Sequence, residues 1–336
     1  MGLIGIGISI LNLLKKAVVV DESFTFTVKT DNTGTSNNDQ FTLPLSSSFN
    51  GITANVDWGD GNNDTITAYN QSEVTHTYSA AGTYTIIITN AIRSFRFNGG
   101  GDRLKITNVS NWGVFELNQS QSFRSCANMT ITATDAPTVS INDFYRMFFG
   151  CTALTGNIST WDVSGVTSFR DTFRGCVAFN SPLGAWDVSN ATSLQQMFNG
   201  CNSFNQPLES WDTSSVRSIN QMFRDATVFN QSLNSWDVSS VTSFYGVFRN
   251  ADSYDQNLGS WDLSSGTVIS DFLRDATGLS TTNYNSTLIG WANTGVPSGL
   301  TCNFGSSKYT AGGTAEAARN TLINTYNWTI IDGGAA

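Results

Sequence analysis

Aspartates recur at one fixed spacing in the middle of the chain, and they are the first candidates for chemistry. Each stands in a W-D-x-S sequence: Asp162, Asp187, Asp212, Asp237 and Asp262. A row of carboxylates could bind calcium, which prefers oxygen ligands, although no ligand spacing here repeats that of a Ca²⁺-binding loop. The pattern is also typical of an Asx turn, in which the carboxylate accepts hydrogen bonds from the residues that follow it. We expect the turn and no cofactor, with calcium as the alternative.

Cysteines share this spacing and could supply thiol chemistry. The column consists of Cys126, Cys151, Cys176 and Cys201. Alanine takes the same place in the following units, which favours a small buried side chain over disulfides between neighbouring units. A Cys/His or Ser/His pair would need a histidine, and the sequence contains only His76, in a motif that indicates a packed turn residue. We therefore expect no catalytic residue and no enzyme activity.

These residues belong to a repeat with a period of 25 residues. Tryptophans mark the repeat at Trp161, Trp186, Trp211, Trp236 and Trp261. One unit of this size cannot bury its own apolar face, so successive units must stack and cover one another. Phenylalanines recur from Phe123 to Phe248, and we expect both aromatic columns to fill the interior; platforms for stacking sugars are the alternative. The column of Asn180, Asn205 and Asn230 predicts a ladder of hydrogen bonds to the backbone of neighbouring turns.

One column of the repeat changes its residue type from unit to unit, as a solvated surface would. It reads Arg170, Gln195, Asn220, Tyr245 and Ser270. We predict that these side chains form an exposed binding strip along one side of the stack.

The flanking segments follow different patterns. Residues 21–92 alternate apolar and polar side chains between breaks rich in Gly, Asn and Asp, which predicts antiparallel strands in a small β-sandwich. The repeat region spans 93–280. Residues 281–336 leave the repeat, and a helix over 314–324 and a strand over 328–331 would cap the stack. The predicted fold class is mainly β: a sandwich, then a solenoid of 25-residue coils with a helical C-terminal cap.

Two motifs resemble known families. The sequence V-D-W-G-D-G at 56–61, followed by V-T-H-T-Y-S-A-A-G-T-Y-T-I at 74–86, resembles the PKD domain, and this implies an immunoglobulin-like sandwich that serves as a spacer or adhesion module. The 25-residue unit, clearest as M-F-N-G-C-N-S-F-N-Q-P-L at 197–208, is similar to the repeats of BspA-like leucine-rich-repeat surface proteins. That resemblance implies a leucine-rich-repeat fold, surface display, and binding to host cells, matrix or glycans, with no catalytic residues to transfer.

The first twenty residues are apolar up to Leu14 and then carry Lys15 and Lys16. A secretory signal has its positive charges before the apolar run, and a membrane-spanning helix needs about 20 apolar residues. We therefore predict that residues 1–20 are an anchor arm, which docks on a capsid, tail or membrane partner through residues 1–16. An unusual export or interfacial segment and a strand of the neighbouring sandwich are the alternatives.

Composition limits the classes of function that this sequence can have. The formal net charge is −9 over 336 residues, and a nucleic-acid partner is not expected because such proteins need a basic face. We predict a non-enzymatic recognition or adhesion protein on a virion surface, such as a bacteriophage spike, fibre or head-decoration protein, that contacts a host surface glycan or protein. A bacterial cell-surface adhesin is the alternative. A polysaccharide depolymerase is third, and its mark would be two carboxylates at catalytic separation. A homo-oligomer is compatible with the sequence.

Overall fold

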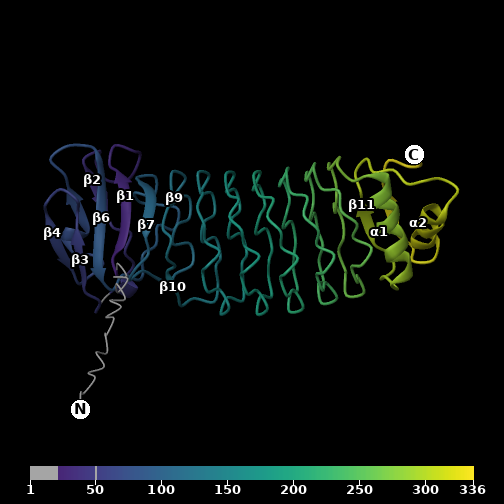
Figure 1. Cartoon of the computed structure of the whole chain (residues 1–336), viewed down its shortest axis with the longest axis horizontal. Coiled ribbons are helices and arrows are strands. Elements are labelled where there is room, and N and C mark those ends of the chain that lie inside the picture. The colour runs from purple at the N-terminus through teal and green to yellow at the C-terminus, as the bar shows by residue number, and fades with distance from the viewer. Residues whose placement is uncertain (1–21, 50) are drawn as a thin grey trace, which may run out of the picture.

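The computed structural model describes residues 22–49 and 51–336, and over these residues the protein is mainly β with few helices. The predicted anchor arm, residues 1–20, lies outside the described residues. The molecule is elongated: a β-sheet region forms one end, a row of similar coils forms the middle, and two helices lie at the other end (Figure 1). The predicted mainly β class is confirmed.

The N-terminal region is built on a six-stranded sheet in the order β4-β3-β6-β1-β7-β9. Its strands are β1 (Phe24–Lys29), β3 (Ala54–Asp57), β4 (Asn63–Ile66), β6 (Thr83–Asn90), β7 (Ile106–Asn111) and β9 (Thr130–Ile131). The side chains of Phe24, Phe26 and Val28 in β1 are buried, as the alternation of apolar residues predicts. Strand β1 is antiparallel to both β6 and β7, whereas β7 is parallel to β9. The sheet therefore changes to parallel pairing where the coils begin.

Smaller elements complete this end of the molecule. Strand β2 (Gln40–Thr42) pairs with β5 (Thr75–Thr77) in a separate antiparallel ribbon. Two short 3₁₀ helices span Ser47–Phe49 and Ser72–Val74. Strand β8 (Glu116–Leu117) pairs in parallel with β10 (Thr138–Val139).

The coils stack in register with the sequence repeat. Parallel bridges join residues 25 positions apart in an unbroken series from Asp143 through Ser168, Ser193, Ser218 and Ser243 to Val268. Backbone amides also bond to the next coil, as in the hydrogen bonds from Phe148 N to Thr172 O (3.0 Å) and from Phe198 N to Met222 O (3.0 Å). Each coil thus satisfies much of its backbone through its neighbours, as the repeat period requires.

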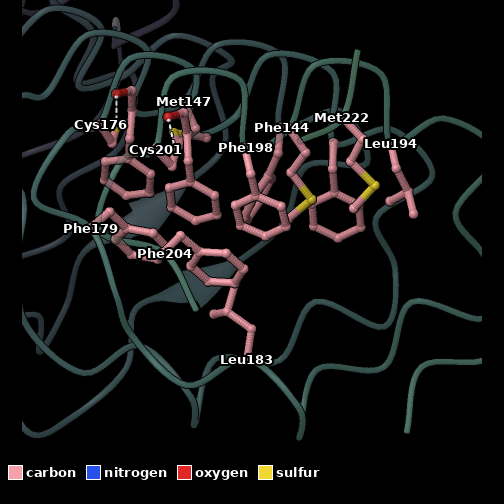
Figure 2. Close-up of a cluster of buried hydrophobic side chains, with 14 of the residues drawn as sticks. Phe144, Met147, Cys176, Phe179, Leu183, Leu194, Phe198, Cys201, Phe204 and Met222 are labelled. Atoms are coloured by element: carbon pink, nitrogen blue, oxygen red, sulfur yellow. Dashed lines mark hydrogen bonds between the residues drawn. The ribbon is translucent and has the colours of Figure 1, made fainter. Parts of the chain in front are cut away.

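Two aromatic columns form the core of the stack. Rings of the first column lie 5.7 to 5.9 Å apart between centroids and nearly parallel, from Phe123 through Phe148, Phe173, Phe198 and Phe223 to Phe248. The second column, Phe179, Phe204, Phe229 and Tyr254, has ring centroids 6.0 Å apart. Figure 2 shows Phe179 and Phe204 side by side below Phe198, with the thiols of Cys176 and Cys201 on the opposite side.

The C-terminal end combines helices and short strands. Helix α1 (Thr281–Asn293) and helix α2 (Thr314–Asn324) pack together, and β11 (Thr301–Asn303) pairs in parallel with β12 (Thr329–Ile331). The amide of Leu273 donates to Asn303 O (2.8 Å), so β11 continues the stack beyond the last coil. The predicted helix over 314–324 is confirmed, whereas α1 was not predicted. No helix in the described part of the chain is long and apolar enough to cross a lipid bilayer.

Candidate functional site

The aspartate column forms a row of Asx turns. Asp162 Oδ1 accepts hydrogen bonds from Ser164 N (3.1 Å) and Ser164 Oγ (2.7 Å). The same pairs of bonds occur at Asp187 and Asp212, while Asp237 and Asp262 accept from the backbone amide two residues on. Hydrogen bonds from the serines lower the pKa of the first four carboxyls of the column. Within residues 22–49 and 51–336, no three His, Cys, Asp or Glu side chains are grouped to hold a metal ion.

These turns predict an acid-sensitive fold. A carboxyl with a lowered pKa stabilises the folded protein above its unfolded pKa, and this contribution disappears as the pH falls through the folded pKa. We expect the melting temperature, measured by circular dichroism, to decrease once the pH is lowered below about 4. In the double variant Ser189→Ala/Ser214→Ala, which lacks two of the hydroxyl donors, the acid-induced fall should be shallower than in the wild type. Identical pH profiles would show that the serine hydrogen bonds do not set this dependence.

The asparagine column forms the predicted ladder. Asn180 Oδ1 accepts hydrogen bonds from Asn205 N and from the Gln206 side chain (both 3.0 Å), and Asn205 Oδ1 accepts from the next coil in the same way. Asn230 Oδ1 in turn accepts from Asp255 N (2.9 Å). Asp255 Oδ1 then accepts from Ser280 N (2.8 Å), the residue that caps α1. The ladder therefore fixes the start of the C-terminal helix.

The cysteine column lies inside the stack. Cys151, Cys176 and Cys201 each donate a thiol hydrogen bond to the backbone carbonyl 28 residues earlier, at 2.9 to 3.0 Å. The described cysteines are free thiols and all are buried. Burial raises the pKa of Cys151 to about 12 and raises the pKa of Cys126, Cys176 and Cys201 as well. Such thiols are poor nucleophiles at neutral pH because the thiolate is scarce.

We expect the thiols to resist chemical labelling in the folded protein. A thiol reagent such as dithionitrobenzoate should react with the cysteines only after denaturant is added, because both burial and protonation protect them. Absorbance at completion in denaturant gives the total thiol count. Rapid reaction of any cysteine in native buffer would contradict its position in the core.

Tryptophans of the repeat also point inward. Trp211 Nε1 donates to Leu183 O and Trp236 Nε1 to Leu208 O (both 2.9 Å), and the same bond to the carbonyl 28 residues earlier occurs at Trp186 and Trp261. The five side chains are at most 4% exposed, so they line the core and offer no platform for sugars. Trp291 of α1 donates to Leu258 O (2.8 Å) and so continues the column from a helix. Sequence reasoning missed this residue because it breaks the 25-residue period.

His76 is packed as predicted, but it lies in strand β5 and not in a turn; it contacts the neighbouring W-G-D-G turn. Its Nε2 lies 2.9 Å from Asp60 Oδ2, and its ring stacks on Trp58 with 4.8 Å between centroids. Burial alone would raise the pKa of Asp60, but the hydrogen bonds from His76 and Asn62 lower it overall. Gly59 has φ +80°, and a Cβ there would lie 2.3 Å from Thr85 O, so the W-G-D-G turn requires glycine.

A buried ion pair was missed by the sequence analysis. Asp102 and Lys105 side chains are fully buried, with Lys105 Nζ 3.9 Å from Asp102 Oδ1. Lys105 Nζ donates to the backbone carbonyls of Ser36, Asn37 and Gln40 at 2.7 to 3.2 Å. Asp102 accepts from the amides of residues 35, 36 and 42 and from Ser36 Oγ (2.6 Å). The pair fastens the segment before β2 to the turn before β7, and no motif in the sequence signals it.

Two further aspartates line a hollow of about 510 Å³ over β3, β4 and β6. Asp57 Oδ1 accepts from Gly59 N (2.8 Å), and Asp64 Oδ2 accepts from Trp58 Nε1 (2.8 Å). Both carboxylates therefore hold the neighbouring turn.

The predicted binding strip occupies successive coils. Backbone bonds along the stack place Arg170, Gln195, Asn220, Tyr245 and Ser270 on consecutive rungs. Arg170 is exposed and the other four side chains are half-buried. The guanidinium of Arg170 lies over the ring of Tyr145, 4.3 Å from its centroid, so an aromatic residue of the preceding coil joins the strip. The structure thus shows a cation–π contact in the strip, which the variable column alone did not reveal.

Comparison with known proteins places the repeat in a family. No curated protein and no solved structure matches the chain. The family model described as "Mycoplasma protein of unknown function, DUF285" matches residues 117–226 and 183–291. These segments cover the stacked coils and more than half of the chain, and the family is a repeat family of the BspA-like, leucine-rich-repeat type. The chain therefore belongs to the DUF285 family.

Proposed function

We propose that this protein is a non-enzymatic recognition protein, displayed on an exterior surface, that binds its partner through the exposed side of the stacked coils. The observation that carries the proposal is that the side chains that could do chemistry are buried or bonded within the protein. Cysteine and tryptophan side chains are buried, and the aspartates accept hydrogen bonds within their own turns. The residues of the predicted strip vary from coil to coil, and all five are at least partly exposed to solvent.

The proposal includes a finer description of the fold. The stacked coils form a solenoid of the leucine-rich-repeat type, supported by the parallel bridges at 25-residue intervals. The N-terminal sheet, with the β2–β5 ribbon, forms a PKD-like sandwich. The packing of Trp58 against His76 and of His76 against Tyr78 supports this, because these residues belong to the motifs that resemble PKD domains.

Binding by such a rod is multivalent. Each coil offers a few polar contacts, and several coils that engage one extended partner, or several copies that engage one surface, raise the overall avidity without any single strong contact. The description of the family as Mycoplasma proteins favours a bacterial cell surface as the place of display. Display on a bacteriophage virion stays a prediction.

A binding assay with the full chain tests the function. Fluorescently labelled protein should bind saturably to the surface of bacterial or host cells, and unlabelled protein should compete. The same protein denatured by heat is the control for nonspecific adsorption. Absence of saturable binding to either kind of cell would contradict the proposal, and shortening of a polysaccharide during incubation would favour the depolymerase. Immunogold labelling of bacterial cells and of phage particles distinguishes the two places of display.

A further inference from the structure

Arginines gather around two aromatic rings on the first coils of the stack. The guanidinium carbons of Arg170 and Arg146 lie 4.3 and 4.8 Å from the centroid of Tyr145. Those of Arg146, Arg174 and Arg124 lie 5.2, 5.5 and 5.7 Å from the centroid of Phe149. Arg146 contacts both rings and joins the two groups. We call Arg124, Tyr145, Arg146, Phe149, Arg170 and Arg174 the arginine cluster.

Positive charge in this cluster exceeds the negative charge beside it. Asp171 pairs with Arg146 (3.2 Å) and with Arg174 (3.4 Å). Asp143, two residues before Tyr145, accepts the amide of that residue (3.0 Å). Among the described residues, neither Arg124 nor Arg170 has a carboxylate within 4.0 Å; Arg124 donates instead to the neutral amide oxygen of Gln121 (2.9 Å). In the part of the chain that the structure describes, Asp171 therefore pairs with two of the four arginines, and Arg124 and Arg170 have no ion pair.

The later coils carry arginines at the repeat position of Arg124 and Arg174, but there each arginine forms an ion pair with an aspartate. Arg224 pairs with Asp225 (3.2 Å), and Arg249 and Arg274 both pair with Asp271 and Asp275, at 3.4 to 3.5 Å.

The difference has a local cause. Each coil has two left-handed backbone positions. The second of them, with φ between +57° and +75°, holds Ser125, Gly150, Gly175 and Gly200 in the early coils. Asp225 and Asp275 fill it in later coils. Glycine adds no carboxylate beside the arginines, so at the repeat position of Arg124 and Arg224 an arginine without an ion pair is found, among the coils described, only in the first ones.

The geometry favours a ligand with repeated anionic groups. A guanidinium presents a planar fork of donors that matches a carboxylate, sulfate or phosphate, and stacking on an aromatic ring holds the fork in place. Successive coils place such groups about 4.8 Å apart along the axis. The binding strip continues from Arg170 to the amides of Gln195 and Asn220, which can bind hydroxyl groups. Repulsion from the net charge of −9 acts on any polyanion, so the hydroxyl-binding amides of the strip favour a glycan over a nucleic acid.

We propose that the arginine cluster is a binding site for an anionic glycan, a polysaccharide that carries carboxylate or sulfate groups and lies along the stack. This inference rests on the proposed recognition function and names the chemistry of the partner. The acidic groups bind the arginines, and neutral hydroxyl groups of the glycan contact the strip on the following coils.

Titration of the full chain against immobilised polymers tests the site. The probes are polygalacturonate for carboxylates, heparin for sulfates, dextran as the neutral polymer and a single-stranded DNA oligomer. We expect binding to at least one anionic glycan that weakens with added salt, and none to dextran. The variant Arg124→Gln/Arg170→Gln should lower that affinity by about tenfold or more, because charge-assisted hydrogen bonds are lost.

The matched control is Arg224→Gln, which changes the same repeat position in a neutralised coil. Its affinity for the glycan should stay within about twofold of the wild type, because Arg224 lies outside the arginine cluster and its charge is already paired with Asp225. Equal melting temperatures for the wild type and both variants show that folding is unchanged. The inference fails if neither anionic glycan binds, if DNA binds more tightly than both, or if the two variants lose affinity equally.

The cell-binding assay separates this inference from the proposed function. If Arg124→Gln/Arg170→Gln binds cells like the wild type, the recognition function stands and the arginine cluster is not its site. If the wild type binds no cells but binds a glycan in a cluster-dependent way, the site stands and surface recognition is wrong.

Discussion

Replacing Trp211 by alanine should lower the free energy of unfolding by about 3–5 kcal/mol, the range for a large aromatic removed from a packed core. Trp211 is 3% exposed, and its ring stacks on Trp236 with centroids 6.1 Å apart and planes 8° apart. The substitution also leaves Leu183 O without its indole donor. Since each coil depends on its neighbours, the cavity weakens the contacts on both sides of the substituted coil.

Guanidinium chloride titration, followed by circular dichroism, measures this change. Trp211→Phe is the matched control: it keeps an aromatic ring but loses the hydrogen bond, so its effect should be smaller than that of alanine. Partial unfolding of a repeat array can broaden the transition, so thermal unfolding is followed in parallel. A destabilisation below about 0.5 kcal/mol, typical of surface positions, would place Trp211 outside the core.

Replacing Asp102 by alanine should have an effect of similar size, about 3–5 kcal/mol, because it leaves a buried ammonium without its counterion. It also removes the acceptor of four hydrogen bonds from residues 35, 36 and 42. Burial lowers the pKa of Lys105, and Asp102 acts in the opposite direction. The segment before β2 should therefore lose its attachment to the turn before β7.

A double-mutant cycle tests this interpretation. Asp102→Ala, Lys105→Met and the double variant are compared by denaturant titration, and hydrogen exchange reports on residues 34–42. The double variant should be less destabilised than the sum of the two single variants, since it leaves no unpaired charge. Additive effects would show that the two side chains act independently.

The register of the stack was predictable because each column repeats one residue type at one interval. Asn180 and Asn205 predicted their ladder correctly, since an amide at the same place in every coil reaches the backbone of the next. The W-D-x-S pattern likewise predicted Asx turns, because the bonds lie within one short segment. Contacts of this kind depend only on the period and on local geometry.

Features that depend on distant partners were not predictable. The pair of Asp102 and Lys105 binds residues 60 or more positions earlier, and nothing in the local sequence marks either residue. Helix α1 was missed because its Thr- and Asn-rich sequence has a weak helical preference, and packing of Tyr284, Leu288 and Trp291 compensates. The arginine cluster draws on three positions of the repeat, so following one variable column revealed only Arg170.

The unbroken series of bridges from Asp143 to Val268 has an evolutionary consequence. Because every coil meets the next through the same contacts, a gene that gains or loses a whole 75-nucleotide unit by recombination still encodes matching surfaces on both sides of the junction. The number of coils can therefore change among strains without a change at either end, whereas an insertion or deletion that is not a whole number of 25-residue units would misalign the columns downstream.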